Sequence, residues 1–499
     1  MASATSPLPV TAAQPPAAGL LAALGGASLL AHLLVAGNYG YFRDELYYLA
    51  DGRHLQAGYV DHPLLIGWLA ALVRLTLGDS LVAIHVVPAL ACALIIIITG
   101  LMARELGGGR LAQAVAGLAA LFCLDFLAVG SLFSMDVLDQ LWWALASLIL
   151  LRLLRREAPR LWLLAALVFA AALLTKLTVL FFGLALVLAL LVSPQRRQLR
   201  TRWPWLAGGL AFVGLLPYLI WNAANGWPTV EFWLHYGART NPLDFFTAQI
   251  LQMNPIALPL AVAGLVFYFR PAGARYRLLG WAFVFAYLVL TALRSKAYFL
   301  APALPILFAA GAVAFERWRP RRWLAWLRPA YLVLLALVGL LLAPDVMPIL
   351  PPASVVRAYG PLQQALSDRF GWDSLTRTVQ QVYAALPPAQ RAQACVLTSN
   401  YGEAGALQQL AAPGSLPPAI SGHNNYYLWG PGACTGQVII GVGFKPADFQ
   451  AIYADITLAA NETCQYCIEY ENDLPIVVAS NPKAPLDLAR VWPSVKKYE

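Results

Sequence analysis

Residues 80–102 read SLVAIHVVPALACALIIIITGLM and contain no Asp, Glu, Lys or Arg. A helix that crosses a bilayer needs about 20 consecutive residues that are mostly apolar, and this stretch is long enough. The composition of the whole chain agrees, because 60% of its 499 residues are hydrophobic and only 12% are charged. Soluble domains have a lower apolar fraction. The sequence therefore predicts a helical membrane protein that crosses the bilayer several times.

Similar apolar runs on both sides of this segment predict eleven spans. The only charged residue in the long run 161–193 is Lys176. As a single helix that run would measure about 50 Å, against a hydrocarbon core of about 30 Å. We therefore predict two short spans that meet at Thr175 and Lys176. The predicted spans are residues 19–36, 80–102, 111–129, 135–154, 161–175, 177–193, 204–222, 252–269, 278–293, 298–316 and 323–343.

Basic residues gather in every second connection between these spans. Loops that carry an excess of Lys and Arg face the cytoplasm, so these connections mark the cytoplasmic side. The net charge of +9 follows from this pattern and does not indicate a nucleic-acid partner. Residues 1–19 contain no Lys or Arg, so we expect a retained first span and not a cleaved signal peptide. The basic connections are 103–110, 152–160, 194–203, 270–277 and 317–322.

Three regions follow from this topology: a cytoplasmic tail over 1–18, a transmembrane domain over 19–345 with an external loop at 37–79, and an external soluble domain over 346–499. The protein is expected in a bacterial inner (plasma) membrane. In the last region, CVLTSN, QVIIGVGF and LPIVVAS are typical of buried strands, and PLQQALSDRF and LTRTVQQVYAALP of amphipathic helices. The expected fold is therefore an all-α membrane domain with a small α/β or α+β domain.

Four of the six cysteines lie in this soluble region: Cys395, Cys434, Cys464 and Cys467. Disulfides are favoured outside the cytosol, although the sequence does not assign the pairs. For Cys464 and Cys467, which are separated by two residues, a structural disulfide is favoured over half of a zinc site or a redox pair.

The external loop begins with NYGYFRDELYYLADGRHLQAGYVDHP, residues 38–63. A short helix over RDELYYLADGRHL would bring Asp44, Tyr47, Tyr48 and Asp51 to one face. Solvated charges beside an interfacial aromatic belt are the plain alternative. The following segment, 62–78, is short and interrupted by Arg74, so we expect a helix along the outer interface or a partly re-entrant one.

Several motifs in this order resemble the GT-C type of glycosyltransferase, which uses polyprenyl-phosphate sugars. The family includes the protein O-mannosyltransferases and the lipid A aminoarabinose transferases. The resemblance rests on the external DE pair, GYVDHP, SMDVLDQL, LLTKL and RSKAYFLAPALPIL, and it covers about residues 20–345. The tail segments TSNYGEAGAL and SGHNNYYLWG resemble tails of bacterial members.

The resemblance implies transfer of a sugar from a polyprenyl-phosphate donor to an envelope acceptor, with inversion at the anomeric carbon. The first acidic residue of the pair would be the general base, which maps to Asp44, with Glu45 as the second choice. Cations would stabilise the leaving phosphate. The expected substrate-binding residues are Arg43, Tyr47, Arg53, Asp61, His62, Asp136, Lys176, Arg294 and Lys296.

One position departs from the family pattern. Aminoarabinose transferases carry Lys before Pro in a Y-x-E-K-P-P stretch, whereas this chain has YVDHPL, with His62 in place of that Lys and no second Pro. Because histidine titrates near neutral pH, phosphate binding there would be weaker or sensitive to pH.

Two further expectations concern ligands. Asp44, Glu45, Asp136 and His62 offer ligands for a divalent cation. The resemblance, however, implies a phosphomonoester-linked donor, which needs a metal less than a pyrophosphate does, and we expect no essential metal. A transporter or flippase is the rival class; transporters place polar groups near the membrane midplane, whereas here they gather at the outer ends of the spans. The sugar, the acceptor (lipid, glycan or protein) and the oligomeric state stay open.

Overall fold

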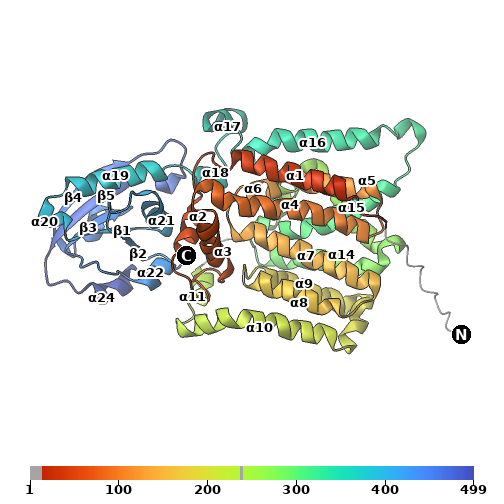
Figure 1. The fold of residues 1–499 in the computed structure, drawn as a ribbon, viewed down its shortest axis with the longest axis horizontal. Coiled ribbons are helices and arrows are strands. Elements are labelled where there is room, and N and C mark those ends of the chain that lie inside the picture. Colours follow the sequence, from red (N-terminus) through yellow and green to blue (C-terminus); the bar gives the residue numbers. More distant parts are fainter. Residues whose placement is uncertain (1–13, 236–239) are drawn as a thin grey trace.

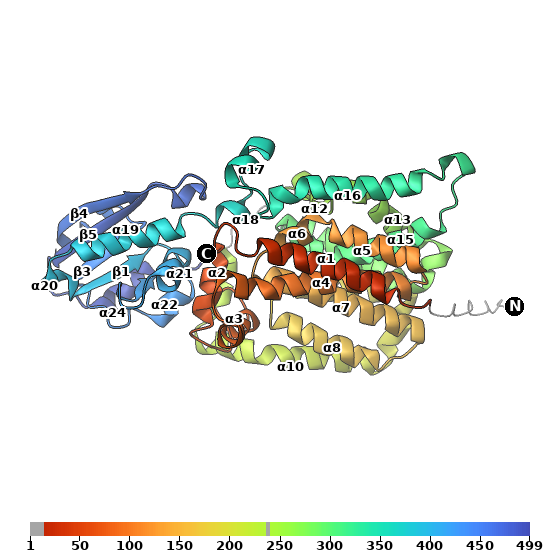
Figure 2. The ribbon, with the colours of Figure 1, turned by 45° about the horizontal axis from the view of Figure 1, so that its top comes forward.

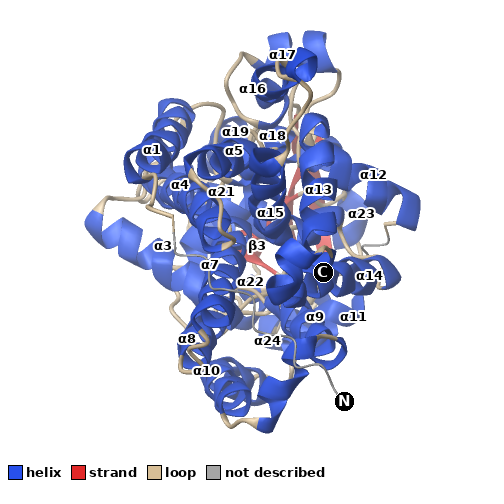
Figure 3. Ribbon diagram, turned by 90° about the vertical axis from the view of Figure 1, so that its right-hand side faces the viewer, coloured by secondary structure: helices blue, strands red, loops and turns tan. Residues whose placement is uncertain are grey.

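The computed structural model describes residues 14–235 and 240–499, so the predicted tail over 1–18 lies mostly outside the described residues. A bundle of helices occupies one end and a domain with a β-sheet the other, with α2 and α3 between them (Figures 1 and 2). Figure 3 views the bundle from the end opposite the sheet. The helical part contains α1 (Ala18–Val35), α2 (Arg43–Asp51), α3 (Leu65–Thr76), α4 (Leu81–Glu105), α5 (Arg110–Leu121), α6 (Leu124–Val129), α7 (Met135–Arg156), α8 (Leu161–Leu173), α9 (Val179–Val192), α10 (Trp203–Ala224), α11 (Pro228–His235), α12 (Pro242–Gln252), α13 (Leu258–Phe269), α14 (Arg277–Ala292), α15 (Leu304–Arg317) and α16 (Leu327–Val346).

Helices occupy all eleven segments predicted as spans, but several are shorter than a bilayer requires. Within the described residues, six helices are long and apolar enough to cross a membrane, and up to eight spans result if each of two bent helix pairs counts as one. The predicted count of eleven therefore exceeds what length and composition support. The break between α8 and α9 lies where Lys176 predicted it. The segment 62–78 forms the short apolar helix α3.

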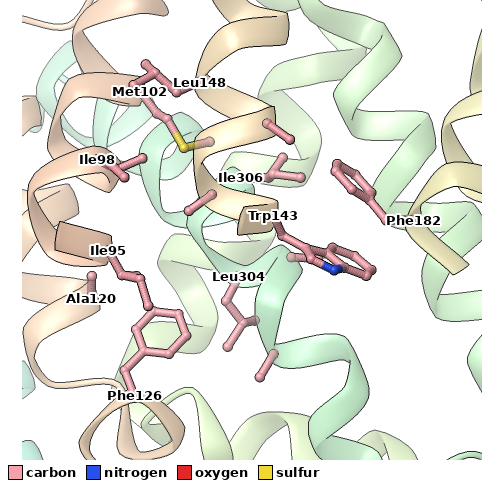
Figure 4. Packing of buried hydrophobic residues seen from close by; sticks show 14 of the residues in the cluster. Ile95, Ile98, Met102, Ala120, Phe126, Trp143, Leu148, Phe182, Leu304 and Ile306 are labelled. Atoms are coloured by element: carbon pink, nitrogen blue, oxygen red, sulfur yellow. The ribbon is translucent and has the colours of Figure 1, made fainter. Parts of the chain in front are cut away.

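The central helices of the bundle are α4, α7 and α15. Their most apolar windows are 61%, 78% and 83% buried, whereas those of α1, α10 and α16 are 22%, 22% and 17% buried. In the core, the ring of Trp143 stacks on Phe182 with centroids 4.3 Å apart (Figure 4). The peripheral helices present their apolar side chains outward, as expected for helices that face lipid.

The basic connections meet at one end of the bundle. Glu105, at the end of α4, accepts hydrogen bonds from Arg152 (3.2 Å) and Arg155 (2.7 Å) of α7. Arg275 donates to Glu157 (2.6 Å) in the same region. These contacts confirm the prediction that the loops at 103–110, 152–160 and 270–277 share one face. The soluble domain lies at the other end (Figure 1).

The soluble domain is built on a five-stranded sheet with strand order β2-β1-β3-β5-β4. β1 runs parallel to β2 and β3, whereas β5 is antiparallel to β3 and β4. Alternate residues of β3 face opposite sides, so Val438 and Ile440 pack under α19 and α21 while Ile439 packs with Phe449. The elements are α19 (Trp372–Ala385), β1 (Ala394–Thr398), α21 (Tyr401–Leu410), β2 (Ala419–Ser421), α22 (Asn425–Trp429), β3 (Val438–Val442), α23 (Pro446–Phe449), β4 (Tyr453–Glu462) and β5 (Leu474–Pro482).

The cysteine prediction holds for one pair. Cys395 and Cys434 form a disulfide that links β1 to the loop before β3. The expectation that Cys464 and Cys467 take part in disulfides is wrong for this structure, in which both side chains are free thiols. The backbone N–H of Cys467 donates to the sulfur of Cys464 (3.2 Å), so the two residues share a tight turn without a bond between their sulfur atoms.

The membrane domain and the soluble domain share a core at α2. Leu46 is 1% exposed and packs with Val396, Ile440 and Leu407 of the soluble domain. A leucine of the loop 37–79 therefore completes the hydrophobic core of a domain that begins about three hundred residues later in the chain.

Candidate active site

Asp44 and Glu45 lie next to each other at the start of α2 but face opposite environments. Successive helical residues point about 100° apart, so one side chain turns into the protein while the other stays at the surface. Glu45 is completely buried. The side chain of Asp44 is 29% exposed. This difference separates the two residues that the sequence left as alternative bases.

Glu45 joins three segments of the membrane domain. One carboxylate oxygen accepts from Nε2 of His85 (2.8 Å) on α4 and from the N–H of Phe133 (2.7 Å), and the other accepts from the N–H of Phe42 (2.8 Å). Burial opposes the ionised form, but the adjacent His85 and these hydrogen bonds hold the pKa of Glu45 below its ordinary value. Glu45 therefore has no free oxygen to offer a substrate.

Asp44 keeps one oxygen open. Its Oδ1 accepts a hydrogen bond from the hydroxyl of Tyr401 (2.8 Å) and lies 3.8 Å from Nε of Arg43. Among the described residues, none donates a hydrogen bond to its Oδ2. A partly exposed carboxylate with one fixed and one open oxygen can accept a proton from a bound acceptor.

Arg43 links this carboxylate to the soluble domain. Its Nη2 lies 3.7 Å from Oδ2 of Asp368. The guanidinium also sits 5.6 Å from the ring centre of Tyr401 and 5.2 Å from that of Tyr470, and it donates to the Tyr470 hydroxyl. Arg43 is thus held in place by an acidic residue and two aromatic rings.

The turn between α8 and α9 positions Lys176. Trp142 of α7 donates its indole N–H to Oγ1 of Thr175 (2.9 Å). Two residues after Lys176, the hydroxyl of Thr178 donates to Asp139 (2.7 Å), also on α7. Residues on both sides of Lys176 are therefore hydrogen-bonded to α7, the helix whose first turn carries Asp136.

Lys176 forms an ion pair with Asp136. Its ammonium also lies 5.2 Å from the ring centre of Tyr298 and 4.8 Å from that of Phe299. The ammonium of Lys296 sits 6.0 Å from the same Tyr298 ring. Both side chains of the ion pair retain access to solvent, at 11% for Lys176 and 27% for Asp136.

Lys296 connects this group to Asp44. Burial lowers the pKa of Lys296, while the nearby carboxylates of Asp44 and Asp136 oppose that shift and Arg43 adds to it. Asp44, Asp136 and Arg43 therefore all lie within electrostatic reach of Lys296. The structure brings together Arg43, Asp44, Asp136, Lys176 and Lys296, which the sequence had proposed from four separate motifs.

A buried polar group lies behind this cluster. Nε2 of His62 is 3.1 Å from Oδ2 of Asp51, and Asn425 donates to the other oxygen of Asp51 (2.8 Å). Tyr47 donates its hydroxyl to Asp61 (2.9 Å). Burial disfavours the charged forms of both Asp51 and His62. At Asp51 burial dominates and raises the pKa to about 6. At His62 the carboxylates of Asp61 and Asp51 outweigh burial and raise the pKa to about 9.

His62 is fully buried, so contact with a substrate phosphate would require this pair to open. Its place in the sequence suggested a phosphate ligand, but its surroundings are those of a histidinium that holds the loop 51–63 against α2 and the soluble domain.

The His62–Asp51 pair predicts that stability falls as the solution becomes alkaline. A histidine with a folded-state pKa near 9 and an ordinary value of 6.5 stabilises the fold below pH 6.5, and this contribution disappears between pH 6.5 and 9. The raised pKa of Asp51 adds a loss of the same sign between pH 3.8 and 6. Thermal unfolding from pH 6 to 10 should show the alkaline decline in the wild type and not in His62→Gln. His235→Gln, at an exposed position, is the control. An equal decline in His62→Gln and His235→Gln would contradict the assignment.

Two of the proposed residues have contacts outside the cluster. Arg53 donates to the side chain of Gln409 (2.5 Å) and lies 3.6 Å from Asp79, so it joins the loop 37–79 to the end of α21. Arg294 is exposed and has a left-handed backbone (φ 51°); its carbonyl accepts from the N–H of Thr240 (3.0 Å).

Among the described residues, no three His, Cys, Asp or Glu side chains converge in a way that could hold a metal ion. The cluster instead combines carboxylates with lysine and arginine.

Several residues of the site come from the far end of the chain and were not predicted: Tyr401, Tyr470, Asp368 and Asn425. A signal for one of them was present. Asn400 and Glu403 form a capping box, whose N-x-x-E pattern marks the start of α21 and hence the position of Tyr401.

Part of the chain matches a known protein family. Residues 61–221 match the family described as dolichyl-phosphate-mannose-protein mannosyltransferase. This family match, taken with the structural likeness described below, confirms the resemblance to GT-C-type glycosyltransferases.

The particular relatives are the following. Lipid A galacturonosyltransferase RgtD from Rhizobium johnstonii is 30% identical over 253 residues, which are 48% of this chain and 52% of RgtD, so the chain spans about half the length of this curated relative. ArnT from Cupriavidus metallidurans has the same fold in crystals with undecaprenyl phosphate (TM-score 0.61) and in the apo state (0.63). In both cases the identity is 16%, over 93% of this chain and 98% of ArnT. The shared fold includes the soluble domain, since the alignment covers nearly the whole chain.

Proposed function

We propose that this protein is a membrane glycosyltransferase that moves a sugar from a polyprenyl-phosphate donor to an envelope acceptor. The observation that carries the proposal is the convergence of the half-open carboxylate of Asp44 with the cations Lys176 and Lys296. A carboxylate base and adjacent cations are what transfer from a lipid phosphate requires. The likeness to ArnT, crystallised with undecaprenyl phosphate, supports that lipid as the carrier.

In the proposed reaction, Oδ2 of Asp44 accepts the proton of an acceptor hydroxyl or amine. The acceptor atom attacks the anomeric carbon from the side opposite the phosphate, so the configuration inverts. The bond between that carbon and the phosphate oxygen breaks, and its electrons leave with the phosphate. Lys176 and Lys296 stabilise the developing negative charge, which is largest in the transition state. Asp136 keeps Lys176 oriented through their ion pair.

The chain is proposed to place this site on the outer side of a bacterial inner membrane. The shared basic face would then be cytoplasmic by the positive-inside rule, and residues 346–499 would be external. A disulfide between Cys395 and Cys434 fits that compartment. Because RgtD is named a lipid A galacturonosyltransferase, lipid A is the acceptor to test first.

The test is release of undecaprenyl phosphate by the purified full-length protein. Donors would be undecaprenyl phosphate carrying galacturonic acid, aminoarabinose or mannose, with lipid A as acceptor and with acceptor-free reactions as the blank. Acceptor-dependent release from one donor would support the proposal. No release from any donor by folded protein would overturn it and favour transport, which counterflow in vesicles would detect.

Replacing Lys176 with Met is expected to lower kcat/KM for the donor about 10-fold, since a hydrogen bond to a charged group is worth about 1.5–3 kcal/mol. The assay is the same lipid-phosphate release. Lys445→Met, at an exposed lysine of the soluble domain, is the matched control and should stay within about twofold, because surface charges contribute little. Equal losses in both variants would argue against a specific role for Lys176.

A further inference from the structure

We propose that Tyr401 of the soluble domain is a positioning residue for the base, so that this domain forms part of the catalytic machinery. The inference rests on the proposed function of Asp44. Its starting point is the hydrogen bond of 2.8 Å from the Tyr401 hydroxyl to Oδ1 of Asp44, which joins residues 357 positions apart.

The hydrogen bond removes a freedom that aspartate otherwise has. The carboxylate of an aspartate rotates over a broad range about its last torsion. The hydrogen bond from Tyr401 to Oδ1 restricts this rotation and so limits the positions that Oδ2 can take. The general base must lie within hydrogen-bond reach of the proton that it accepts, so a restricted Oδ2 favours transfer.

Tyr401 is itself held on several sides. Its ring stacks on Tyr47 (centroids 4.4 Å apart) and contacts His423 (4.6 Å). Its backbone N–H donates to Nδ1 of His423 (3.3 Å). The guanidinium of Arg43 lies over the same ring. A phenol confined in this way can orient a partner without moving toward it.

The start of α21 is also fixed. The side chain of Asn400 accepts from the N–H groups of Gly402 (2.8 Å) and Glu403 (3.0 Å), and its amide donates to Glu471 (2.8 Å). Helix α21 therefore begins at one defined residue, and the next side chain in the sequence is Tyr401.

Two glycines allow α21 to lie directly on α2. A Cβ at Gly402 would come within 2.4 Å of Cγ of Arg43, and one at Gly405 within 2.9 Å of the backbone oxygen and the Cβ of Leu46. Any side chain at Gly405 would push the helices apart. The close packing keeps the Tyr401 hydroxyl within reach of Asp44.

The experiment compares Tyr401→Phe with Tyr453→Phe in the lipid-phosphate assay. Each substitution removes one tyrosine hydroxyl that donates a hydrogen bond. The Tyr401 hydroxyl donates to Asp44, whereas the Tyr453 hydroxyl donates to the carbonyl of Gly436 (2.7 Å), which is far from α2 in the sequence. Tyr401→Phe keeps the ring that stacks on Tyr47. We expect it to lower kcat about 10-fold or more, with KM for the donor unchanged within about twofold. Tyr453→Phe should leave both constants unchanged.

Each other outcome has one meaning. Wild-type kcat in Tyr401→Phe, with Asp44→Asn inactive, would overturn the positioning role and leave the proposed base in place. Equal losses in both phenylalanine variants would show a general effect of the soluble domain and also overturn it. Full activity in Asp44→Asn would overturn the proposed base, and with it this inference.

Discussion

Asp44→Asn is expected to lower the rate of undecaprenyl-phosphate release by about 10²- to 10⁴-fold, the usual contribution of a general base. Asparagine keeps the size of the side chain and can still accept a hydrogen bond from Tyr401, so the helix and its contacts survive. The amide cannot take up the proton of the acceptor. The loss should therefore appear in kcat, while the KM for the donor and the melting temperature change little.

The control for this variant is Asp487→Asn, which removes an exposed carboxylate of the soluble domain that pairs with Arg490. It should behave as wild type. The proposed role of Asp44 would fail if its asparagine variant kept more than about one tenth of the activity, because a base of this kind contributes far more than that.

Glu45→Ala is expected to destabilise the protein by about 3–5 kcal/mol, the usual result of removing one partner of a buried charged pair. The substitution leaves three groups without their acceptor: Nε2 of His85 and the N–H groups of Phe133 and Phe42. Since whole domains are stable by only about 5–15 kcal/mol, the loss should lower the melting temperature strongly.

Thermal unfolding in detergent measures this loss, with Glu157→Ala as the matched control. The side chain of Glu157 is 82% exposed and pairs with Arg275, so its removal should cost about 1 kcal/mol or less. An unchanged melting temperature in Glu45→Ala, combined with lost activity, would instead restore Glu45 as a candidate base. The two neighbouring carboxylates are thus separated by two different measurements.

Much of the membrane domain was predictable because its helices are determined by the composition of short, continuous segments of the sequence. The apolar runs place the helices, and Lys176 marks the turn between α8 and α9. The same motifs proposed Asp44, Asp136, Lys176 and Lys296, which the structure brings together. The number of spans was overestimated because helices such as α5 and α8, with 12 and 13 residues, are shorter than a bilayer requires.

In the soluble domain, the sequence predicted the strands with buried side chains on both faces and missed the others. β4 has mostly exposed or half-buried residues and lies at the edge of the sheet, so no apolar pattern reveals it. β2 has three residues, too few for a periodic signal. The contacts of Tyr401, Asp368 and Asn425 with α2 were not predictable because nothing local encodes which distant helix covers a loop.

The hydrogen bond between Asp44 and Tyr401 also has a consequence for biosynthesis. The chain is made from its N-terminus, so α2 exists long before α21 has been synthesised. The hydrophobic core that Leu46 packs into is formed by residues that are synthesised much later. A ribosome-bound or truncated product would carry the carboxylate without the phenol that holds it. Under the proposed function, the protein would therefore acquire full activity only when the domain that carries Tyr401 has folded.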